Sequence, residues 1–198
     1  MEPIQTEVGA IMALQNGDIR GLEALVNLHQ MRALRTAYAV TKDRALAEDC
    51  VADTFLTVYE RIEQFDAQRA FAPWFNRILV NRALKARQRD RRTGHGDIEQ
   101  DVLLRKIDTD PGPELETARA EARDAIFRAI MALPDRQRVA IVLRYYLDMN
   151  EFTMAEVLGC PVGTVKWRLH AAKKRLRRDT TFVHELALDL VDNKGEAR

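Results

Sequence analysis

Two segments of the sequence carry apolar residues at the spacing of one helical face, and this periodicity constrains the fold more than any other feature. In both segments the residues recur at i, i+4, i+7 and i+11: Val51, Phe55, Val58 and Ile62 in the first, and Val165, Leu169, Ala172 and Leu176 in the second. Such a stripe buries one side of an α-helix. Only 9 glycines and 6 prolines occur in 198 residues, which disfavours a β-rich fold with many tight turns. We therefore predict an all-α protein.

The same reasoning places the other helices. Periodic apolar residues predict helices over 21–40, 45–64, 122–133 and 137–147, and a further helix with Pro73 in its first turn. Asp43 is expected to cap the second of these at its N-terminus. The expected stripe of the first helix is Leu22, Leu25, Val26 and Leu28, and that of the 137–147 helix is Val139, Val142, Leu143 and Tyr146. Residues 65–71, polar in the middle and aromatic at both ends, are expected to form an ordered loop.

A helix-turn-helix is predicted near the C-terminal end. Asn150 is a good N-cap for a short helix, Gly159 suits a left-handed C-cap, and Pro161 blocks continuation. A longer helix then runs from about residue 162 to residue 178. A short helix, a glycine turn and a longer basic helix form the layout of a DNA-binding helix-turn-helix. A plain helical hairpin with a basic exposed face is the alternative, and we favour the former because turn chemistry and charge agree.

Charge is distributed unevenly although the net charge is only +1. Residues 77–92 hold seven basic side chains and one acidic, and residues 166–178 hold seven basic and none acidic. Residues 43–66 hold seven acidic and two basic. Two cationic segments about eighty residues apart suit a polyanion that is contacted at two places. Charge alone supports a second interpretation equally well, in which the two cationic segments are only solvated faces of helices.

The organisation along the chain is interpreted as two small helical domains joined by a flexible acidic linker. Glycine, proline and acidic residues replace the apolar periodicity between the two cationic segments. The expected boundaries are a first domain over 1–92, the linker over 93–118, a second domain with the helix-turn-helix over 119–180, and a tail over 181–198. The tail has the spacing of one more amphipathic helix. We favour its packing on the second domain over its serving as a surface for a regulatory partner.

Several classes of function are disfavoured. No apolar run approaches the roughly 18–20 residues of a membrane span, and no secretory signal is seen, so we expect no membrane insertion. Cys50 and Cys160 are the only cysteines, which suits a reducing cytoplasm. The four histidines have no metal-ligand spacing with them. No phosphate-binding or dinucleotide-binding glycine motif and no nucleophile triad is found. We expect no metal, no cofactor and no catalytic activity.

Taken together, residues 47–84 (AEDCVADTFLTVYERIEQFDAQRAFAPWFNRILVNRAL) and 133–178 (LPDRQRVAIVLRYYLDMNEFTMAEVLGCPVGTVKWRLHAAKKRLRR) resemble two domains of bacterial RNA polymerase sigma factors of the extracytoplasmic-function class. With the helix before each, the resemblance covers about two thirds of the chain, and the order of the two segments makes it specific. It implies a factor that binds core RNA polymerase and recognises the minus-10 and minus-35 promoter elements.

The resemblance also implies residue roles. The helix at 45–64 is expected to dock on the clamp helices of the largest polymerase subunit through Glu48, Asp49 and Asp53. The residues that match the minus-10 pocket and its rim are Phe65, Asp66, Ala67, Gln68, Arg69, Ala70, Phe71, Arg77 and Asn81. Trp74, in step with Ile78, is interpreted as core packing rather than a base contact. The residues that match DNA-facing positions at the minus-35 element are Lys166, Trp167, Arg168, His170, Ala171 and Lys173, and the outward-facing Lys174 joins them.

The implied partners are core polymerase, including the flap of its second-largest subunit, and promoter DNA. Many members of this class are also held by an anti-sigma partner. Some positions depart from the usual pattern: Ala52, Asp53 and Lys85 differ from common residues, Trp167 stands where serine is frequent, and Asp148 where glycine is common. These departures leave the promoter sequence open.

Two other functions compete with this interpretation. One is a helix-turn-helix regulator that binds an operator as a dimer, independently of polymerase. The other is an enzyme that acts on nucleic acid. Transcription with purified polymerase separates them from a sigma factor.

Overall fold

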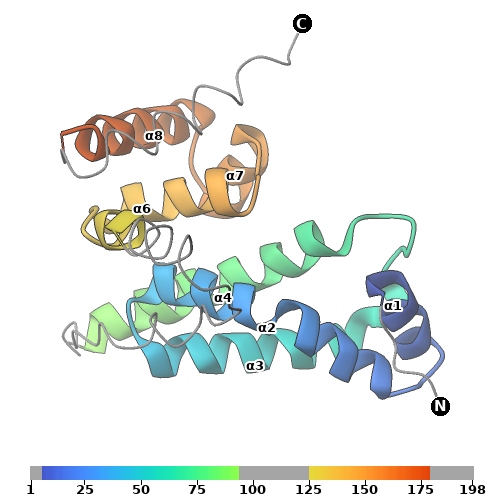
Figure 1. Ribbon diagram of the computed structural model, residues 1–198. Helices are drawn as coiled ribbons and strands as arrows, with labels where there is room; N and C mark the ends of the chain where they lie inside the picture. Colours follow the sequence, from blue (N-terminus) through green and yellow to red (C-terminus); the bar gives the residue numbers. More distant parts are fainter. Residues whose placement is uncertain (1–5, 94–124, 179–198) are drawn as a thin grey trace, which may run out of the picture. The chain divides into compact units, whose positions relative to one another are not determined.

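The computed structural model describes residues 6–93 and 125–178, and these residues contain helices, turns and loops but no strand (Figure 1). The all-α prediction is confirmed. The chain separates into two compact units, residues 1–99 and 100–198. Residues 94–118 of the predicted linker and the predicted tail at 181–198 lie outside the described residues.

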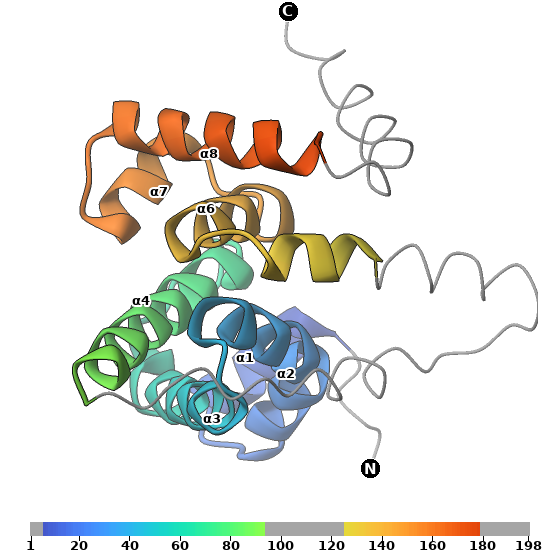
Figure 2. The same ribbon diagram turned by 90° about the vertical axis from the view of Figure 1, so that its left-hand side faces the viewer.

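The first unit is a helical bundle. Its elements are α1 (Glu7–Gln15), α2 (Arg20–Thr41), α3 (Arg44–Arg61), the short 3₁₀ helix η1 (Ile62–Gln64) and α4 (Phe71–Thr93). Helices α2, α3 and α4 pack against one another, and α1 packs on α2 and η1 (Figures 1 and 2). The core consists of side chains with almost no exposed surface, among them Leu25, Ala37, Val40, Val58, Phe75, Leu79 and Val80.

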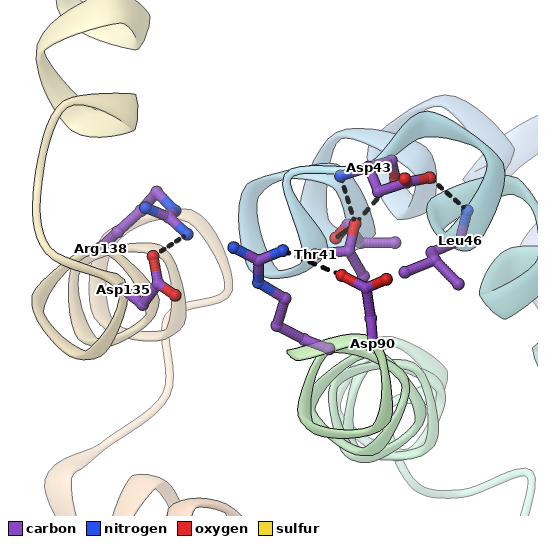
Figure 3. Close-up of polar contacts among 8 residues, drawn as sticks. Thr41, Asp43, Leu46, Asp90, Asp135 and Arg138 are labelled. Carbon is purple, nitrogen blue, oxygen red and sulfur yellow. Dashed lines mark hydrogen bonds and ion pairs between the residues drawn. The ribbon is translucent and has the colours of Figure 1, made fainter. Parts of the chain in front are cut away.

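The α2–α3 corner shows why these helices end and begin where they do. Lys42 takes the left-handed conformation (φ 58°) that terminates α2, and Asp43 caps α3 by accepting a hydrogen bond of 2.9 Å from the amide of Leu46. The Asp43 amide in turn donates to the buried Thr41 hydroxyl at 3.3 Å (Figure 3). The predicted cap at Asp43 is confirmed.

Helix α1 was not predicted, and α2 differs from its predicted stripe. Leu25 is buried as expected, but Leu28 is 50% exposed, so its placement in the core was wrong. Helix α1 lies very close to the start of α2. A Cβ atom at Gly21 would come within 2.3 Å of the carbonyl oxygen of Ala10 and 2.6 Å of the amide nitrogen of Leu14. Only glycine at position 21 permits this approach.

An aromatic cluster fixes the start of α4. The ring of Phe71 lies 5.7 Å from that of Phe65, 5.7 Å from that of Trp74 and 5.6 Å from that of Phe75. Trp74 is half-buried and also packs on Phe65 at 4.8 Å, as its predicted packing role requires. His29 of α2 closes the other side of the cluster, 5.2 Å from the ring of Phe71.

The half-buried position of His29 predicts a pH-dependent stability. Burial lowers the pKa of His29 below its ordinary value, and the nearby Arg32 lowers it further, while Glu7, whose Oε1 lies 2.8 Å from Nε2, partly opposes the shift. The unfolded chain therefore binds the proton more readily than the folded chain. The contribution of His29 to stability should be complete above about pH 6.5 and should be lost as the pH falls below that value.

We expect His29→Gln to flatten the decline of unfolding free energy between about pH 7.5 and pH 5.5. Denaturant titrations in a Trp167→Phe background would isolate the fluorescence of Trp74, the other tryptophan, which lies in the first unit. The same substitution at the exposed His170 of the second unit is the control. An unchanged slope in His29→Gln would exclude His29 as the titrating group.

The second unit contains a helix over 125–131, then α6 (Asp135–Ile141), the π-helical turn η3 (Val142–Tyr146), α7 (Glu151–Leu158) and α8 (Val162–Leu176). Helix α6 packs against α8 and α7 packs against α8. Arg138 has no exposed surface, and its guanidinium donates to the Leu133 carbonyl at 3.0 Å. It also donates to the Asp135 carboxylate at 2.9 Å (Figure 3). The bond to Leu133 joins α6 to the turn before it, and the bond to Asp135 lies within the first turn of α6.

The predicted turn chemistry of α7 and α8 is confirmed. The Asn150 side chain accepts a hydrogen bond of 2.9 Å from the Thr153 amide, and Gly159 ends α7 with φ 58°. Pro161 precedes α8 directly. Asp148 has φ 53°, the left-handed conformation that glycine adopts most easily, which explains why glycine is the common residue there in the family that the sequence resembles.

Candidate nucleic-acid interface

Helix α8 has one buried side and one outward side. Val165, Leu169, Ala172 and Leu176 are buried as the periodicity predicted. On the opposite side Trp167 is 64% exposed, and Lys166, His170 and Lys174 are exposed with it. Trp167, His170 and Lys174 are spaced three and four residues apart, so they follow one another along the outward side of the helix.

The remaining predicted positions lie at the flanks of this side. Arg168, Ala171 and Lys173 are half-buried. Lys166 reaches α7, where its Nζ lies 3.6 Å from a carboxylate oxygen of Glu151, and Lys173 lies over the ring of Tyr145 at 5.4 Å. The structure thus places the seven predicted residues on the outward side of α8 and on its two flanks, with Trp167, His170 and Lys174 most prominent.

The outward side of α8 carries basic and aromatic side chains that are suited to binding double-stranded DNA. Arginine and lysine donate to guanine O6 and N7 in the major groove or to phosphates, and an apolar ring can contact a thymine methyl group. In a helix-turn-helix the first residues of the second helix reach the base edges, while positions farther along meet the backbone. Arg168 and Trp167 lie in the second turn of α8 and Lys174 in its last turn.

The loop between η1 and α4 is exposed at its tip and shaped by its own hydrogen bonds. The five residues from Asp66 to Ala70 are all exposed. The Asp66 carboxylate accepts from the Gln68 amide at 3.0 Å, and the Arg69 amide donates to the Asp66 carbonyl at 2.9 Å. The Arg69 guanidinium also lies 3.4 Å from the Asp66 carboxylate. The loop therefore has a defined turn rather than an open coil.

The two aromatic residues that flank this loop are buried. Phe65 is 7% exposed and Phe71 is 1% exposed, and Phe71 is already the first residue of α4. Neither ring has the surface to stack on a base in this arrangement. Within the predicted minus-10 set, the structure separates a buried frame, Phe65 and Phe71, from the exposed tip at 66–70.

The other two residues of that set lie farther along α4. Arg77 is exposed and Asn81 is half-buried, and they lie one turn apart on the side of α4 away from its buried residues. Asn81 also lines a groove between α3 and α4 together with Asp49 and Asp53. The structure thus brings one predicted minus-10 residue beside two predicted docking residues.

The outward side of α3 is acidic with an apolar centre. Glu48, Asp49 and Asp53 are exposed, as their predicted role requires. Leu56 is 58% exposed and Tyr59 is 53% exposed on the same side of the helix. The sequence interpretation missed these two residues, although their spacing from Ala52 at i+4 and i+7, off the buried stripe, is the signal that identifies them.

The α3–α4 groove has a volume of about 570 Å³ and places acidic residues of α3 opposite basic residues of α4. Arg82 crosses it, donating to Asp53 at 2.9 Å and to the Thr57 hydroxyl at 2.6 Å. Cys50 lies at its base, where burial, and secondarily Asp53, raises the pKa of the thiol. The thiol is therefore protonated at neutral pH.

Other kinds of site are not found in the described part of the chain. None of its helices combines the length and the apolar character of a transmembrane span. Within residues 6–93 and 125–178, no group of three or more His, Cys, Asp or Glu side chains is placed to hold a metal ion.

Comparisons with protein families match both units. Residues 25–93 match the family described as Sigma-70 region 2, and residues 123–176 match Sigma-70, region 4. The first match contains α3, the 65–70 loop and α4, and the second contains α6 to α8.

Similar whole proteins are also known. The ECF RNA polymerase sigma-E factor of Haemophilus influenzae is 31% identical over 182 residues, covering 86% of this chain and 93% of that protein. The ECF RNA polymerase sigma factor SigW of Bacillus subtilis is 28% identical over 174 residues, covering 85% and 93%.

Two solved structures share the fold. The sigma factor RpoE in complex with the anti-sigma factor NepR, from Bartonella quintana, has a TM-score of 0.54 and 26% identity over 79% of this chain and 92% of that one. CnrH in complex with the cytosolic domain of CnrY has a TM-score of 0.54 and 23% identity over 85% and 93%.

Proposed function

The chain belongs to the ECF RNA polymerase sigma factors, and from this premise we propose how its two units divide the work. As a sigma factor it binds core RNA polymerase and directs promoter-specific transcription initiation through the minus-10 and minus-35 elements. The observation that carries the function is the occurrence, in one chain, of a region 2 unit and a region 4 unit, each with a strongly basic helix.

The second unit recognises the minus-35 element. Helix α8 enters the major groove with Trp167 and Arg168 at the base edges and with Lys174 toward the phosphates. Its remaining DNA-facing residues are Lys166, His170, Ala171 and Lys173. The exposed outward side of α8 and its freedom from acidic residues support this assignment.

The first unit recognises the minus-10 element and binds the polymerase. The exposed loop tip, Asp66 to Ala70, receives an unpaired base, while Arg77 and Asn81 follow the strand along α4. Phe65 and Phe71, buried at the two ends of the loop, fix it on the first unit. Helix α3 docks on the clamp helices of the largest subunit through Glu48, Asp49 and Asp53, with Leu56 and Tyr59 as the apolar centre of the contact.

The partners follow from this division. The second unit also meets the flap of the second-largest subunit, and the factor acts in the cytoplasm, where polymerase and DNA are. The chemistry of RNA synthesis belongs to the polymerase, so the factor needs no catalytic group of its own. A dimeric operator-binding regulator is not favoured, because it leaves the region 2 match and the acidic side of α3 without a role.

Transcription with purified components tests the function. Core polymerase, this protein and a library of promoter sequences should yield specific transcripts only when protein and polymerase are both present. Transcripts from polymerase alone, or none from the mixture, would refute the proposal. Specific duplex binding by the lone protein at physiological salt would favour the operator-binding regulator instead.

Two substitutions in α8 should separate base reading from phosphate contact. Arg168→Ala should cost about 1–3 kcal/mol of promoter binding, and the loss should depend on the minus-35 sequence. Lys174→Ala should weaken all promoters about equally and lower the salt dependence by about one phosphate contact. Holoenzyme affinity across a minus-35 library at several salt concentrations measures both. An equal loss on all sequences for Arg168→Ala would make it a phosphate contact.

We also propose that an anti-sigma protein holds this factor inactive. The structural relative from Bartonella quintana was solved with an anti-sigma factor, which supports the proposal. A protein encoded beside this chain's gene should bind it and lower its promoter-specific transcription. If neighbouring gene products leave transcription unchanged, the proposal loses its support.

A further inference from the structure

The C-terminal residue of α1 makes a long-range contact with the segment that leads into the 65–70 loop. The side-chain amide of Gln15 donates to the carbonyl oxygen of Phe65 at 2.8 Å and to that of Ile62 at 3.0 Å. Both bonds are partly buried and join residues about fifty positions apart in the sequence. One NH₂ group thus uses both of its hydrogens on the backbone at the base of the loop.

The segment that Gln15 holds is the fixed base of the loop. Ile62 and Phe65 are buried, whereas the residues from Asp66 onward are exposed. The loop tip is shaped by bonds to Asp66, so its orientation depends on the direction in which the chain leaves Phe65. The two carbonyl acceptors of Gln15 lie directly before that point.

Helix α1 is itself held firmly against the bundle. It has nine residues, too few to be stable as an isolated helix. The close approach at Gly21 and the buried side chains of Ile11 and Leu14 seat it on α2. Helix α1 is therefore fixed on α2 and also bonded through Gln15 to the base of the loop. We call this connection from α2 through α1 to Ile62 and Phe65 the brace.

We propose that Gln15 is a positioning residue that sets the 65–70 loop for reading the minus-10 element. This inference rests on the proposed role of the loop. Gln15 does not contact DNA; it acts through the backbone carbonyls of Ile62 and Phe65. Removing its donors leaves the Phe65 carbonyl to find water, and the Ile62 carbonyl keeps only the bond of 3.1 Å that it accepts from the Phe65 amide. Both losses favour a displaced loop base.

The test compares Gln15→Leu and Gln15→Glu with the wild-type protein. Leucine keeps a similar volume without donors, and at neutral pH a glutamate carboxylate would face two carbonyl oxygens, so its effect should be at least as large. Gln30→Leu is the matched control, because Gln30 is exposed on α2 and has no role in the brace. The full-length variants are assembled with core polymerase and assayed on promoters that differ only in the minus-10 element.

We expect Gln15→Leu to lose about tenfold in discrimination between the best and a mismatched minus-10 element, the size expected for leaving one polar group unpaired. Polymerase affinity and minus-35 dependence should stay unchanged. Hydrogen exchange in the free protein should accelerate at the Gln68 and Arg69 amides. An equal loss on every minus-10 sequence, or unchanged exchange at these amides, would overturn the proposal.

The two readouts separate this inference from the proposed function. If the wild-type holoenzyme gave no promoter-specific transcripts, the proposed function would fail, and the role in minus-10 reading with it. Hydrogen exchange would then still decide whether Gln15 fixes the loop.

Discussion

Replacing Phe71 by alanine should destabilise the first unit by about 3–5 kcal/mol, because it opens a cavity in the aromatic cluster. The ring is 1% exposed and contacts Phe65, Trp74, Phe75 and His29. Loss of this ring should also release the base of the 65–70 loop. Equilibrium unfolding followed by Trp74 fluorescence in a Trp167→Phe background gives the free energy directly.

The experiment also decides what Phe71 does. Phe71→Leu keeps most of the buried volume and should cost clearly less than Phe71→Ala, with promoter opening largely retained. A residue that stacked on a base would behave differently. Both variants would then remain folded and both would fail to open the promoter, and that result would contradict the packing role.

Reversing two charges on α3 should weaken polymerase binding by about a hundredfold or more. Like charges brought together across an interface cost several kcal/mol. Glu48 and Asp49 are exposed, and the ion pair of 2.6 Å between Glu48 and Arg44 is a surface pair of little value to folding. The double variant Glu48→Lys and Asp49→Lys should therefore stay folded while losing its partner. Titration of labelled variants with core polymerase measures the affinity.

A control variant keeps this result specific to the docking side. Glu23→Lys makes the same kind of reversal on an exposed position of α2 and should bind core polymerase as the wild type does. Each α3 reversal alone should lie between the control and the double variant. If Glu23→Lys weakened binding as much as either α3 reversal, general charge rather than the α3 surface would be responsible.

Much of the fold could be predicted because its signals are local. The stripes that begin at Val51 and Val165, the cap at Asn150 and the C-cap at Gly159 each act within a few residues. Helix α1 escaped prediction because its exposed side is as apolar as its buried side: Val8 and Met12 face outward while Ile11 and Leu14 face the core. Without a polar side, periodicity does not mark a helix.

The remaining differences depend on tertiary contacts. Leu28 follows Leu25 at i+3, a spacing that core residues of a helix also have. Periodicity alone does not show where the buried side of a helix ends and its exposed side begins. Arg138 is buried because Leu133 and Asp135 supply its hydrogen bonds, which no pattern of residue types reveals. For the same reason Gln15 could not be recognised: its acceptors are backbone oxygens about fifty residues away.

The protonated thiol at the base of the α3–α4 groove has a practical consequence for labelling. Cys50 is only 6% exposed, which blocks the approach of a maleimide reagent, and burial also raises the pKa of its thiol, so Cys50 should stay unmodified in the folded protein. The half-exposed Cys160 lies in the turn just before α8. Wild-type protein should thus accept a single fluorophore beside α8, and its signal would test the proposed promoter contact of that helix without any engineered cysteine.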